Sequence, residues 1–206
     1  MKRRGNMSFH RWIILLAMVF LFFGNKEVAA QQEMQLLFYN TENLFDTIND
    51  PIKRDDEFTP GGRKAWDSER YQLKLKMLAE AIVSGAPHLP ALIGLGEIEN
   101  MAVLEDLVAT EQLLEGNYRI IHQEGLDIRG IDVALLYNPN VFQYMCHQVL
   151  HINMPFDLEY KTRDILYVKG VLLNDTIHCY VNHWPSRRGG MEESELRRIT
   201  AAKRLR

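Results

Sequence analysis

The spacing of apolar residues predicts two strand–helix pairs at the start of the globular part of the chain. A short apolar run over 34–39 predicts a strand, and the Asp-, Pro- and Gly-rich stretch 46–66 predicts a long loop. Apolar residues then recur at helical spacing over 67–84, before Gly and Pro end the predicted helix. A second apolar run over 91–96 predicts a buried strand, and 100–110 predicts a second helix capped by its first Asn.

From residue 118 onward the pattern changes to a series of strands. Two Asn-containing segments, 138–140 and 174–175, predict hairpin turns. The segment 192–206 has the composition of a helix. The predicted strands are 118–123, 131–137, 141–152, 165–173 and 176–182. Strand–helix pairs followed by hairpins predict an α/β fold, with packed sheets and helices on the outside.

The first 30 residues have the three parts of a secretory signal peptide. Basic residues precede a short apolar run over 13–23, and Val-Ala-Ala at 28–30 provides a small-residue cleavage site. We expect cleavage after Ala30 and export, either to the periplasm or by secretion. The alternative is an N-terminal membrane anchor. The apolar run is shorter than the roughly 20 residues that a spanning helix needs, so we expect no stable membrane span after cleavage.

Removing this leader changes the charge of the chain. The whole chain has 24 Lys and Arg against 27 Asp and Glu. The leader holds five of the basic residues and one acidic residue, so 19 and 26 remain, a net charge of −7. This balance disfavours non-specific binding to nucleic acid, although it allows a local basic pocket. The two cysteines, Cys146 and Cys179, lie in predicted strands, and both a disulfide and free thiols stay open.

Several polar side chains stand where a predicted strand meets a loop, and such ends commonly carry functional sites. They are Asn40, Glu97, Asp132, Arg163 and His183. Glu97 is the strongest candidate, because a carboxylate at the end of an apolar strand is costly unless it is paired or bound to a metal. One or two carboxylates with phosphate oxygens are the usual ligands of Mg²⁺. The alternative is a solvated loop acid.

The segment that begins at His183 has the residue types of a phosphate-binding loop. Imidazole can exchange a proton, and Arg187 and Arg188, followed by two glycines, provide guanidinium donors and open backbone. Asp132 is a candidate to orient the His183 ring. The alternatives are a solvated basic loop and a strand-edge acid, and Asn40 alone also fits a plain turn.

Taken together, five segments resemble the endonuclease/exonuclease/phosphatase superfamily, and they occur in its order. The resemblance covers essentially all of 34–206. It implies a DNase I-like fold, a four-layer α/β/β/α sandwich. The matching segments are Asn40-Thr41-Glu42-Asn43-Leu44-Phe45, Gly96-Glu97-Ile98-Glu99-Asn100, Arg129-Gly130-Ile131-Asp132-Val133-Ala134-Leu135-Leu136-Tyr137, Thr162-Arg163-Asp164-Ile165-Leu166 and the residues around His183.

The resemblance also implies roles for these residues in hydrolysing a phosphoester. Glu97 would hold Mg²⁺ or Mn²⁺, and Asn40 would help arrange the metal and the nucleophile. Arg163 and His183 would contact the scissile phosphate, while a metal-assisted water attacks phosphorus. The substrate is a phosphoester of unspecified identity, and nucleic acid is open but not favoured by the net charge.

The sequence departs from the superfamily after His183. An Asp-x-Asn pair and a final Asp-His pair are expected there, and we find no match to either. We therefore expect residues 31–206 to be the N-terminal portion of the domain, truncated before its C-terminal part. Turnover should then be strongly reduced, because the groups that activate water are absent. The alternatives are an inactive fragment that acts at most as a binding module, and an extracellular nuclease.

Overall fold

The computed structural model describes residues 33–206, apart from 86 and 188, and residues 34–206 form one compact unit. The predicted signal peptide, residues 1–30, lies outside the described residues. In the described part of the chain, no helix is both long enough and apolar enough to cross a membrane. The elements are β1 (Leu36–Leu44), the 3-10 helix η1 (Asp56–Phe58), α2 (Ser68–Ser84), β2 (Leu92–Ile98), α3 (Met101–Val108), the 3-10 helix η2 (Leu114–Gly116), β3 (Arg119–His122), β4 (Asp132–Tyr137), β5 (Phe142–Leu150), β6 (Ile165–Leu172), β7 (Asp175–Val181) and α4 (Met191–Leu205).

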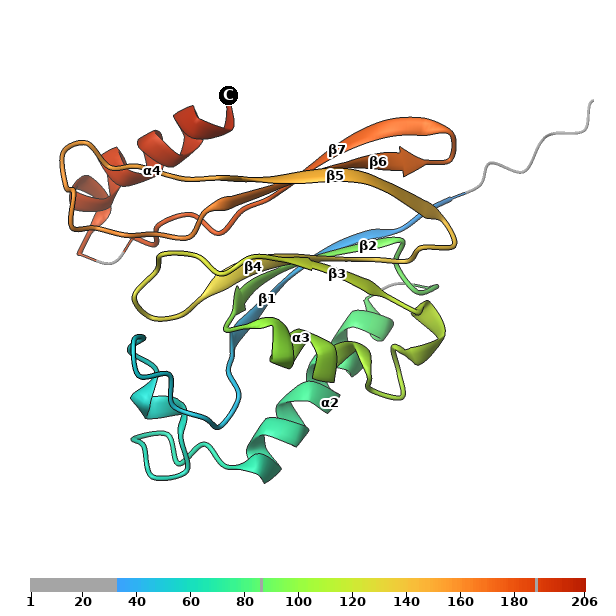
Figure 1. Cartoon of the computed structure of the whole chain (residues 1–206), viewed down its shortest axis with the longest axis horizontal. Helices are drawn as coiled ribbons and strands as arrows, with labels where there is room; N and C mark the ends of the chain where they lie inside the picture. Colours follow the sequence, from blue (N-terminus) through green and yellow to red (C-terminus); the bar gives the residue numbers. More distant parts are fainter. Residues whose placement is uncertain (1–32, 86, 188) are drawn as a thin grey trace, which may run out of the picture. The chain divides into compact units, whose positions relative to one another are not determined.

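The strands form two sheets that pack face to face. The first has the order β1-β2-β4-β3, with β1 parallel to β2 and the other pairs antiparallel. The second is the antiparallel sheet β5-β6-β7. Helices α2 and α3 cover the outer face of the first sheet (Figure 1). Helix α4 packs through Ala201 against Ile152 and Ile165 at one end of the second sheet. The predicted α/β sandwich of DNase I type is confirmed.

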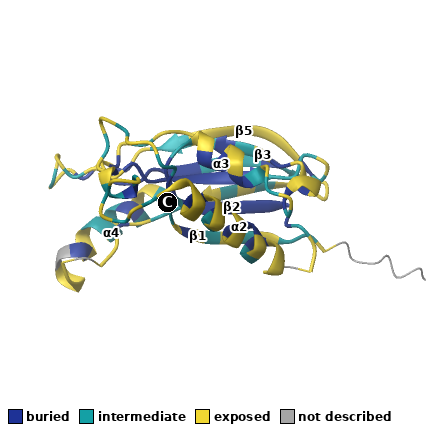
Figure 2. Ribbon diagram, turned by 90° about the horizontal axis from the view of Figure 1, so that it is seen from below, coloured by how far each residue is buried: buried dark blue, intermediate teal, exposed yellow. Residues whose placement is uncertain are grey.

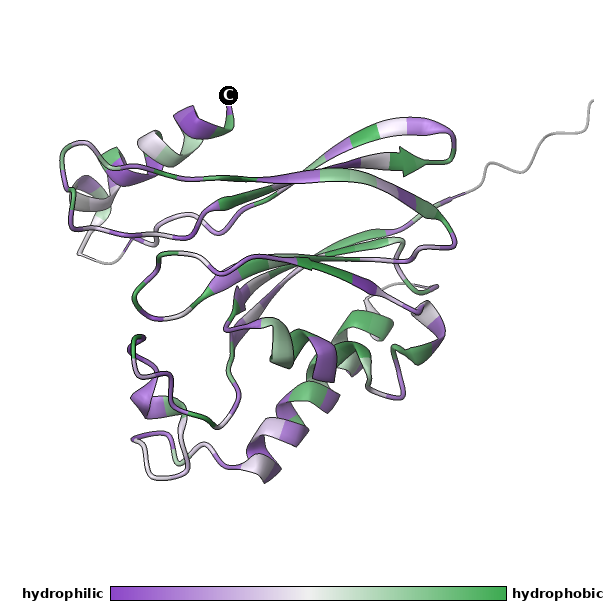
Figure 3. Ribbon diagram, viewed as in Figure 1, coloured by the Kyte–Doolittle hydropathy of each residue, from purple (hydrophilic) through white to green (hydrophobic). Residues whose placement is uncertain are grey.

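The central strands are apolar on both faces because each face packs against another layer. In β4, Ala134 and Leu136 contact the helices, whereas Val133 and Leu135 contact the second sheet. These strands are the buried centre of the unit in Figure 2 and the hydrophobic centre in Figure 3, and the outward faces of the helices are exposed. Burial on two sides explains why the strand sequences are continuous apolar runs and do not alternate.

The two predicted helices of the first layer both begin after a capping side chain, and the Asn100 cap is the one predicted from the sequence. The Asp67 carboxylate accepts a hydrogen bond from the Arg70 backbone N–H at 3.0 Å, and Asn100 accepts one from the Val103 N–H at 3.0 Å. Each cap satisfies a backbone donor that has no partner within its helix. These local signals are why the helix starts could be predicted from the sequence.

One predicted hairpin is wrong and the other is present. The segment 138–140 connects β4 to β5, which belong to different sheets, so the chain crosses between layers there. Turn residues show that the chain reverses, but they do not specify which sheet the next strand joins. Between β6 and β7 the hairpin is real, with Leu173 and Asn174 at φ 52° and 69° in the left-handed region that tight hairpins use.

The predicted loop 46–66 is anchored to the rest of the unit. It contains η1, and its Phe58 ring stacks on Phe45 with 4.0 Å between ring centroids. Trp66 also donates a hydrogen bond from its indole N–H to the Phe45 carbonyl at 3.0 Å. These contacts hold the loop beside the end of β1.

The two cysteines are free. Cys146 on β5 pairs with Lys169 of β6, whereas Cys179 on β7 pairs with Val168. Strand β6 therefore lies between them, and two strand spacings exceed the Cα separation that a disulfide spans, about 7 Å at most. Both cysteines are therefore free thiols in this fold, which is one of the two alternatives that the sequence left open.

Candidate active site

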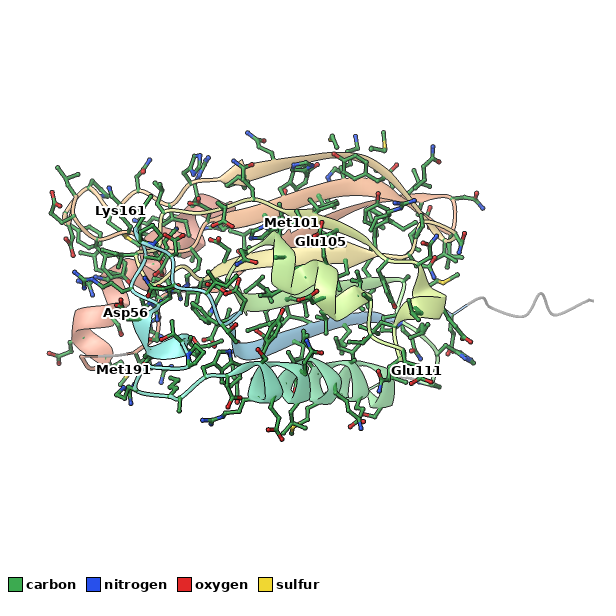
Figure 4. All side chains as sticks on the ribbon, turned by 60° about the horizontal axis from the view of Figure 1, so that its bottom comes forward. Asp56, Met101, Glu105, Glu111, Lys161 and Met191 are labelled. Carbon is green, nitrogen blue, oxygen red and sulfur yellow. The ribbon has the colours of Figure 1, made fainter. Side chains whose placement is uncertain are left out.

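The strand ends named from the sequence meet at one end of both sheets. Glu97 lies near the end of β2, and Asp132 at the start of β4 pairs with Ile98. Val181 ends β7 just before His183 and pairs with Leu166 at the start of β6. Figure 4 shows the loops at this end, marked by the labelled side chains of Asp56, Lys161 and Met191, whereas Glu111 marks the opposite end.

Glu97 occupies a β-bulge with an unusual backbone conformation. Gly96 and Ile98 pair with Val133 and Asp132, which are adjacent, so Glu97 is an extra residue with no partner on β4. Its φ is 64°, in the left-handed region that non-glycine residues rarely adopt. Such strain persists only where the surroundings enforce it, and it concentrates at functional sites.

Thr41 holds this bulge from the neighbouring strand. Its hydroxyl is 2.9 Å from the carbonyl oxygens of both Gly96 and Glu97 and shares its proton between them. Thr41 is buried, and β1 has its own irregularity between Asn40 and Leu44, opposite the bulge. The two irregular strands together fix the direction in which the Glu97 side chain leaves the sheet.

The Glu97 carboxylate faces the imidazole of His183. The His183 Nε2 atom is 3.5 Å from Glu97 Oε1, and the two side chains are 22% and 18% exposed. The ring lies over Gly96, and its Nδ1 atom is buried without a hydrogen-bond partner. Burial lowers the pKa of His183, the guanidinium of Arg163 lowers it further, and Glu97 partly offsets both. His183 is therefore neutral at pH 7 and remains able to donate or accept one hydrogen bond.

Arg163 lies beneath this pair and positions it. The side chain is buried, and its Nε and Nη2 atoms donate to the carbonyls of His183 and Trp184 at 3.0 and 2.7 Å. Its Nη1 atom donates to Asp127 Oδ2 at 3.2 Å. With its donors directed at protein acceptors, Arg163 fixes the His183 loop, and this geometry does not support the direct phosphate contact that the sequence suggested.

Arg129 presents the more accessible guanidinium. Its Nε and Nη2 atoms donate to the two Asp127 oxygens at 3.1 and 3.0 Å, and its side chain is 49% exposed. The hydrogen bonds to Asp127 raise the pKa of Arg129, and the Glu97 carboxylate adds to this effect. Arg129 and Arg163 line a cavity of about 450 Å³, together with Arg54, Asp127, Ile128, Glu159, Tyr160, Lys161, Ser186, Gly189 and Arg197.

Asp132 does not contact His183, and the expectation that it orients that ring is wrong. The Asp132 Oδ1 atom accepts a hydrogen bond from the Gly125 N–H at 3.0 Å, and Oδ2 faces His122 Nε2 at 3.6 Å. His122 ends β3 and pairs with Ala134, which places it diagonally across from Asp132 and within side-chain reach. No local sequence pattern identifies this pairing, because it depends on the register of β3 against β4.

Of the remaining predicted residues, Asn40 and Arg187 are exposed. Asn40 lies within β1, which continues beyond it, so its predicted place after the strand is wrong. It is exposed, and its side-chain oxygen accepts a hydrogen bond from the Glu42 N–H at 3.2 Å. Arg187 is exposed, and Arg188 lies outside the described residues.

Two basic residues near Glu97 were missed at the level of sequence. Arg129 is one, and its signal was the Asp-x-Arg spacing that lets Asp127 hold its guanidinium. Lys74 is the other. It comes from α2, lies near the carboxylates of Glu42 and Glu97, and has a pKa lowered by partial burial, which the two carboxylates oppose. No pattern in the helix could identify it, since its neighbours come from two strands.

The donors at Glu97 fit a hard divalent cation. The Glu97 side chain is partly exposed, and its ion-pair partner among the described residues is a histidine whose pKa is lowered. Asn40 provides an exposed amide oxygen on the adjacent strand, where it pairs with Gly96. A carboxylate and an amide oxygen are ligand types that Mg²⁺ and Mn²⁺ prefer.

A family comparison agrees with this arrangement. The sequence model of the Endonuclease/Exonuclease/phosphatase family matches residues 35–206. The chain belongs to this family. The match includes the bulged strand of Glu97 and the His183 loop, so the superfamily resemblance seen in the sequence is confirmed. No curated protein shows significant similarity to this member of the family.

Solved structures give a more distant likeness. A humanized D. rerio TDP2 carrying 14 mutations has 11% identity and a TM-score of 0.48, over 76% of this chain and 49% of that one. Truncated Caenorhabditis elegans TDP2 has 18% identity and a TM-score of 0.41, over 60% and 43%. ANGEL2, a 2',3'-cyclic phosphatase, has 14% identity and a TM-score of 0.44, over 80% and 44%. The chain matches less than half the length of these structures.

Proposed function

We propose that this family member carries the Glu97–His183 part of a divalent-metal-dependent phosphoesterase site. The observation that supports this most is the strained bulge, which directs the Glu97 carboxylate to 3.5 Å from the His183 ring in a family of phosphoesterases. The reaction would be attack of water on the phosphorus of a phosphomonoester or phosphodiester.

The cation would be held by Glu97 with the help of Asn40. When bound, Mg²⁺ or Mn²⁺ supplies positive charge to the phosphate oxygens and lowers the pKa of a bound water. Glu97 is suited to hold it because Thr41 and the bulge limit the positions that its backbone can take. A fixed carboxylate need not reorganise as the reaction proceeds.

His183 and Arg129 would act on the phosphate itself. A neutral His183 can donate one N–H to a phosphate oxygen, and its lowered pKa keeps the ring uncharged beside the cation. Arg163 holds the backbone of this loop, so that the ring is placed before substrate arrives. The Arg129 guanidinium is charged at any physiological pH, and it can bind a second phosphate oxygen.

The cavity beside these groups would receive the rest of the substrate. Five of its lining side chains are basic and two are acidic, so it favours an anionic molecule despite the net negative charge of the chain. The basic residues are Arg54, Arg129, Lys161, Arg163 and Arg197. We also propose export, which rests on the leader sequence alone.

The test is a hydrolysis assay with a chromogenic phosphodiester and the matching phosphomonoester, with and without Mg²⁺. We expect a Mg²⁺-dependent rate that falls by at least a hundredfold in Glu97→Gln and His183→Ala, and that is unchanged in Glu111→Gln, an exposed acid at the opposite end. Mg²⁺-dependent binding without turnover, lost in Glu97→Gln, would favour the binding-module alternative. A rate or binding indifferent to Glu97→Gln would refute the site.

A further inference from the structure

A second group of metal-ligating side chains lies beside the candidate active site. His122, Glu124 and Asp132 each offer one ligand atom, and all three atoms lie within 4.8 Å of one another. His122 ends β3, Asp132 begins β4, and Glu124 follows in the connecting turn. This group shares no residue with the Glu97–His183 pair.

Two of these side chains are buried, and each has one atom without a hydrogen bond. The His122 and Asp132 side chains are 2% and 4% exposed. His122 Nε2 and Asp132 Oδ2 are both buried atoms without a hydrogen bond, and they face each other at 3.6 Å. Buried polar atoms are nearly always satisfied, so two unsatisfied atoms directed at one point indicate a missing ligand between them.

The surrounding turn is shaped to keep this arrangement. The Gly125 N–H donates to the other Asp132 oxygen at 3.0 Å, and a Cβ at Gly125 would come within 2.4 Å of that oxygen. Lys53 donates from its ammonium to the Gly125 carbonyl at 3.0 Å and closes the turn from outside. A glycine is therefore required for the turn to approach Asp132, and the carboxylate is left with one free oxygen.

The spacing between the His122 and Asp132 ligand atoms is close to that of a tetrahedral ion. With bonds of about 2.1 Å, two ligands of a tetrahedral ion are about 3.4 Å apart, and those of an octahedral ion are about 3.0 Å apart. The His122–Asp132 distance of 3.6 Å is nearer to the tetrahedral value. An imidazole nitrogen also selects zinc-class ions over Mg²⁺, which prefers oxygen.

From this geometry we propose that His122, Glu124 and Asp132 form a site for a zinc-class divalent ion, with one coordination position open. Glu124 is the exposed ligand and lines an open pocket beside the 46–53 segment, which gives the ion a path from solvent. The site does not depend on the phosphoesterase proposal.

The experiment measures Zn²⁺ binding to the metal-free full chain by competition with a chromophoric chelator, and by the shift in Tm. We expect one tight Zn²⁺ per chain. Glu124→Gln should weaken binding at least tenfold without unfolding the protein, since this side chain is exposed. His122→Gln should abolish the Tm shift, and Co²⁺ should give a tetrahedral visible spectrum in the wild type but not in His122→Gln.

Two matched control variants locate the ion. Glu111→Gln and His88→Ala should bind Zn²⁺ as the wild type does, because both side chains are exposed and lie outside the group. If His122→Gln does not fold, Glu124→Gln still decides the outcome. Equal binding by Glu124→Gln and the wild type, no Zn²⁺-induced Tm shift in the wild type, or loss of binding in Glu97→Gln would each overturn the proposal.

Discussion

The strain at Glu97 predicts a reversal in the usual order of alanine and glycine. In an ordinary strand, glycine is less stable than alanine by about 0.5–1 kcal/mol, because it loses more backbone entropy on folding. At φ 64° a side chain with a Cβ costs roughly 1–2 kcal/mol, and glycine avoids this cost. Glu97→Gly should therefore be more stable than Glu97→Ala.

The magnitude follows from comparing two positions. Gln148, an exposed residue of β5 in regular register with Tyr167, provides the reference. There, Gly should be less stable than Ala by about 0.5–1 kcal/mol. The entropy cost of glycine is common to both positions, so the Gly-minus-Ala difference should be more favourable at Glu97 by about 1–2 kcal/mol.

The assay is equilibrium unfolding in urea of the four variants, with the free energy of unfolding as the quantity compared. Both Glu97 variants lack the carboxylate, so loss of that group cancels between them. If Glu97→Gly is less stable than Glu97→Ala by the same amount that separates the two Gln148 variants, the backbone at Glu97 is not strained.

Three further predictions follow from the same structure. Burial raises the pKa of Glu99 from 4.5 to about 8, so the folded state holds a proton that the unfolded state releases. The free energy of unfolding should therefore fall as the pH rises between these values, by at most about 1.4 kcal/mol per pH unit. Glu99→Gln should remove this slope in urea titrations at several pH values. Arg163→Met leaves part of a buried ion pair and two carbonyls unsatisfied, so it should lower the free energy of unfolding by about 3 kcal/mol. Arg129→Met removes a more exposed ion pair and should lower it by no more than about 1 kcal/mol. Equal losses would contradict the positioning role of Arg163. Alkylation of the unfolded, unreduced chain should label both cysteines, and protection of either would show a disulfide.

The sequence was most informative where the signals are local. The caps Asp67 and Asn100 mark helix starts because their side chains bond backbone groups three residues away. Glu97 could be identified because an acid ending an apolar run is costly wherever the strand lies. The other candidates were identified because they stand where a predicted strand meets a loop, and such ends commonly carry functional sites.

The parts that could not be predicted depend on register and on layers. Whether Asp132 meets His183 or His122 depends on how β3 aligns with β4, which no local pattern encodes. The left-handed backbone at Glu97 occurs where β1 and β2 are both irregular, opposite each other. The sequence of either strand alone does not indicate this conformation. In the sequence, Arg163 has the residue type of a phosphate ligand. In the fold, its guanidinium donates to three protein acceptors that come from other segments of the chain.

The most direct test of the central claim is a double-mutant cycle on Mg²⁺-dependent hydrolysis with Glu97→Gln, His183→Ala and the pair combined. If the two residues act as one unit on the phosphate, the double variant should be no slower than the slower single variant. If the two losses multiply, or if the wild type has no Mg²⁺-dependent rate above the Glu97→Gln background, the account of this site is contradicted.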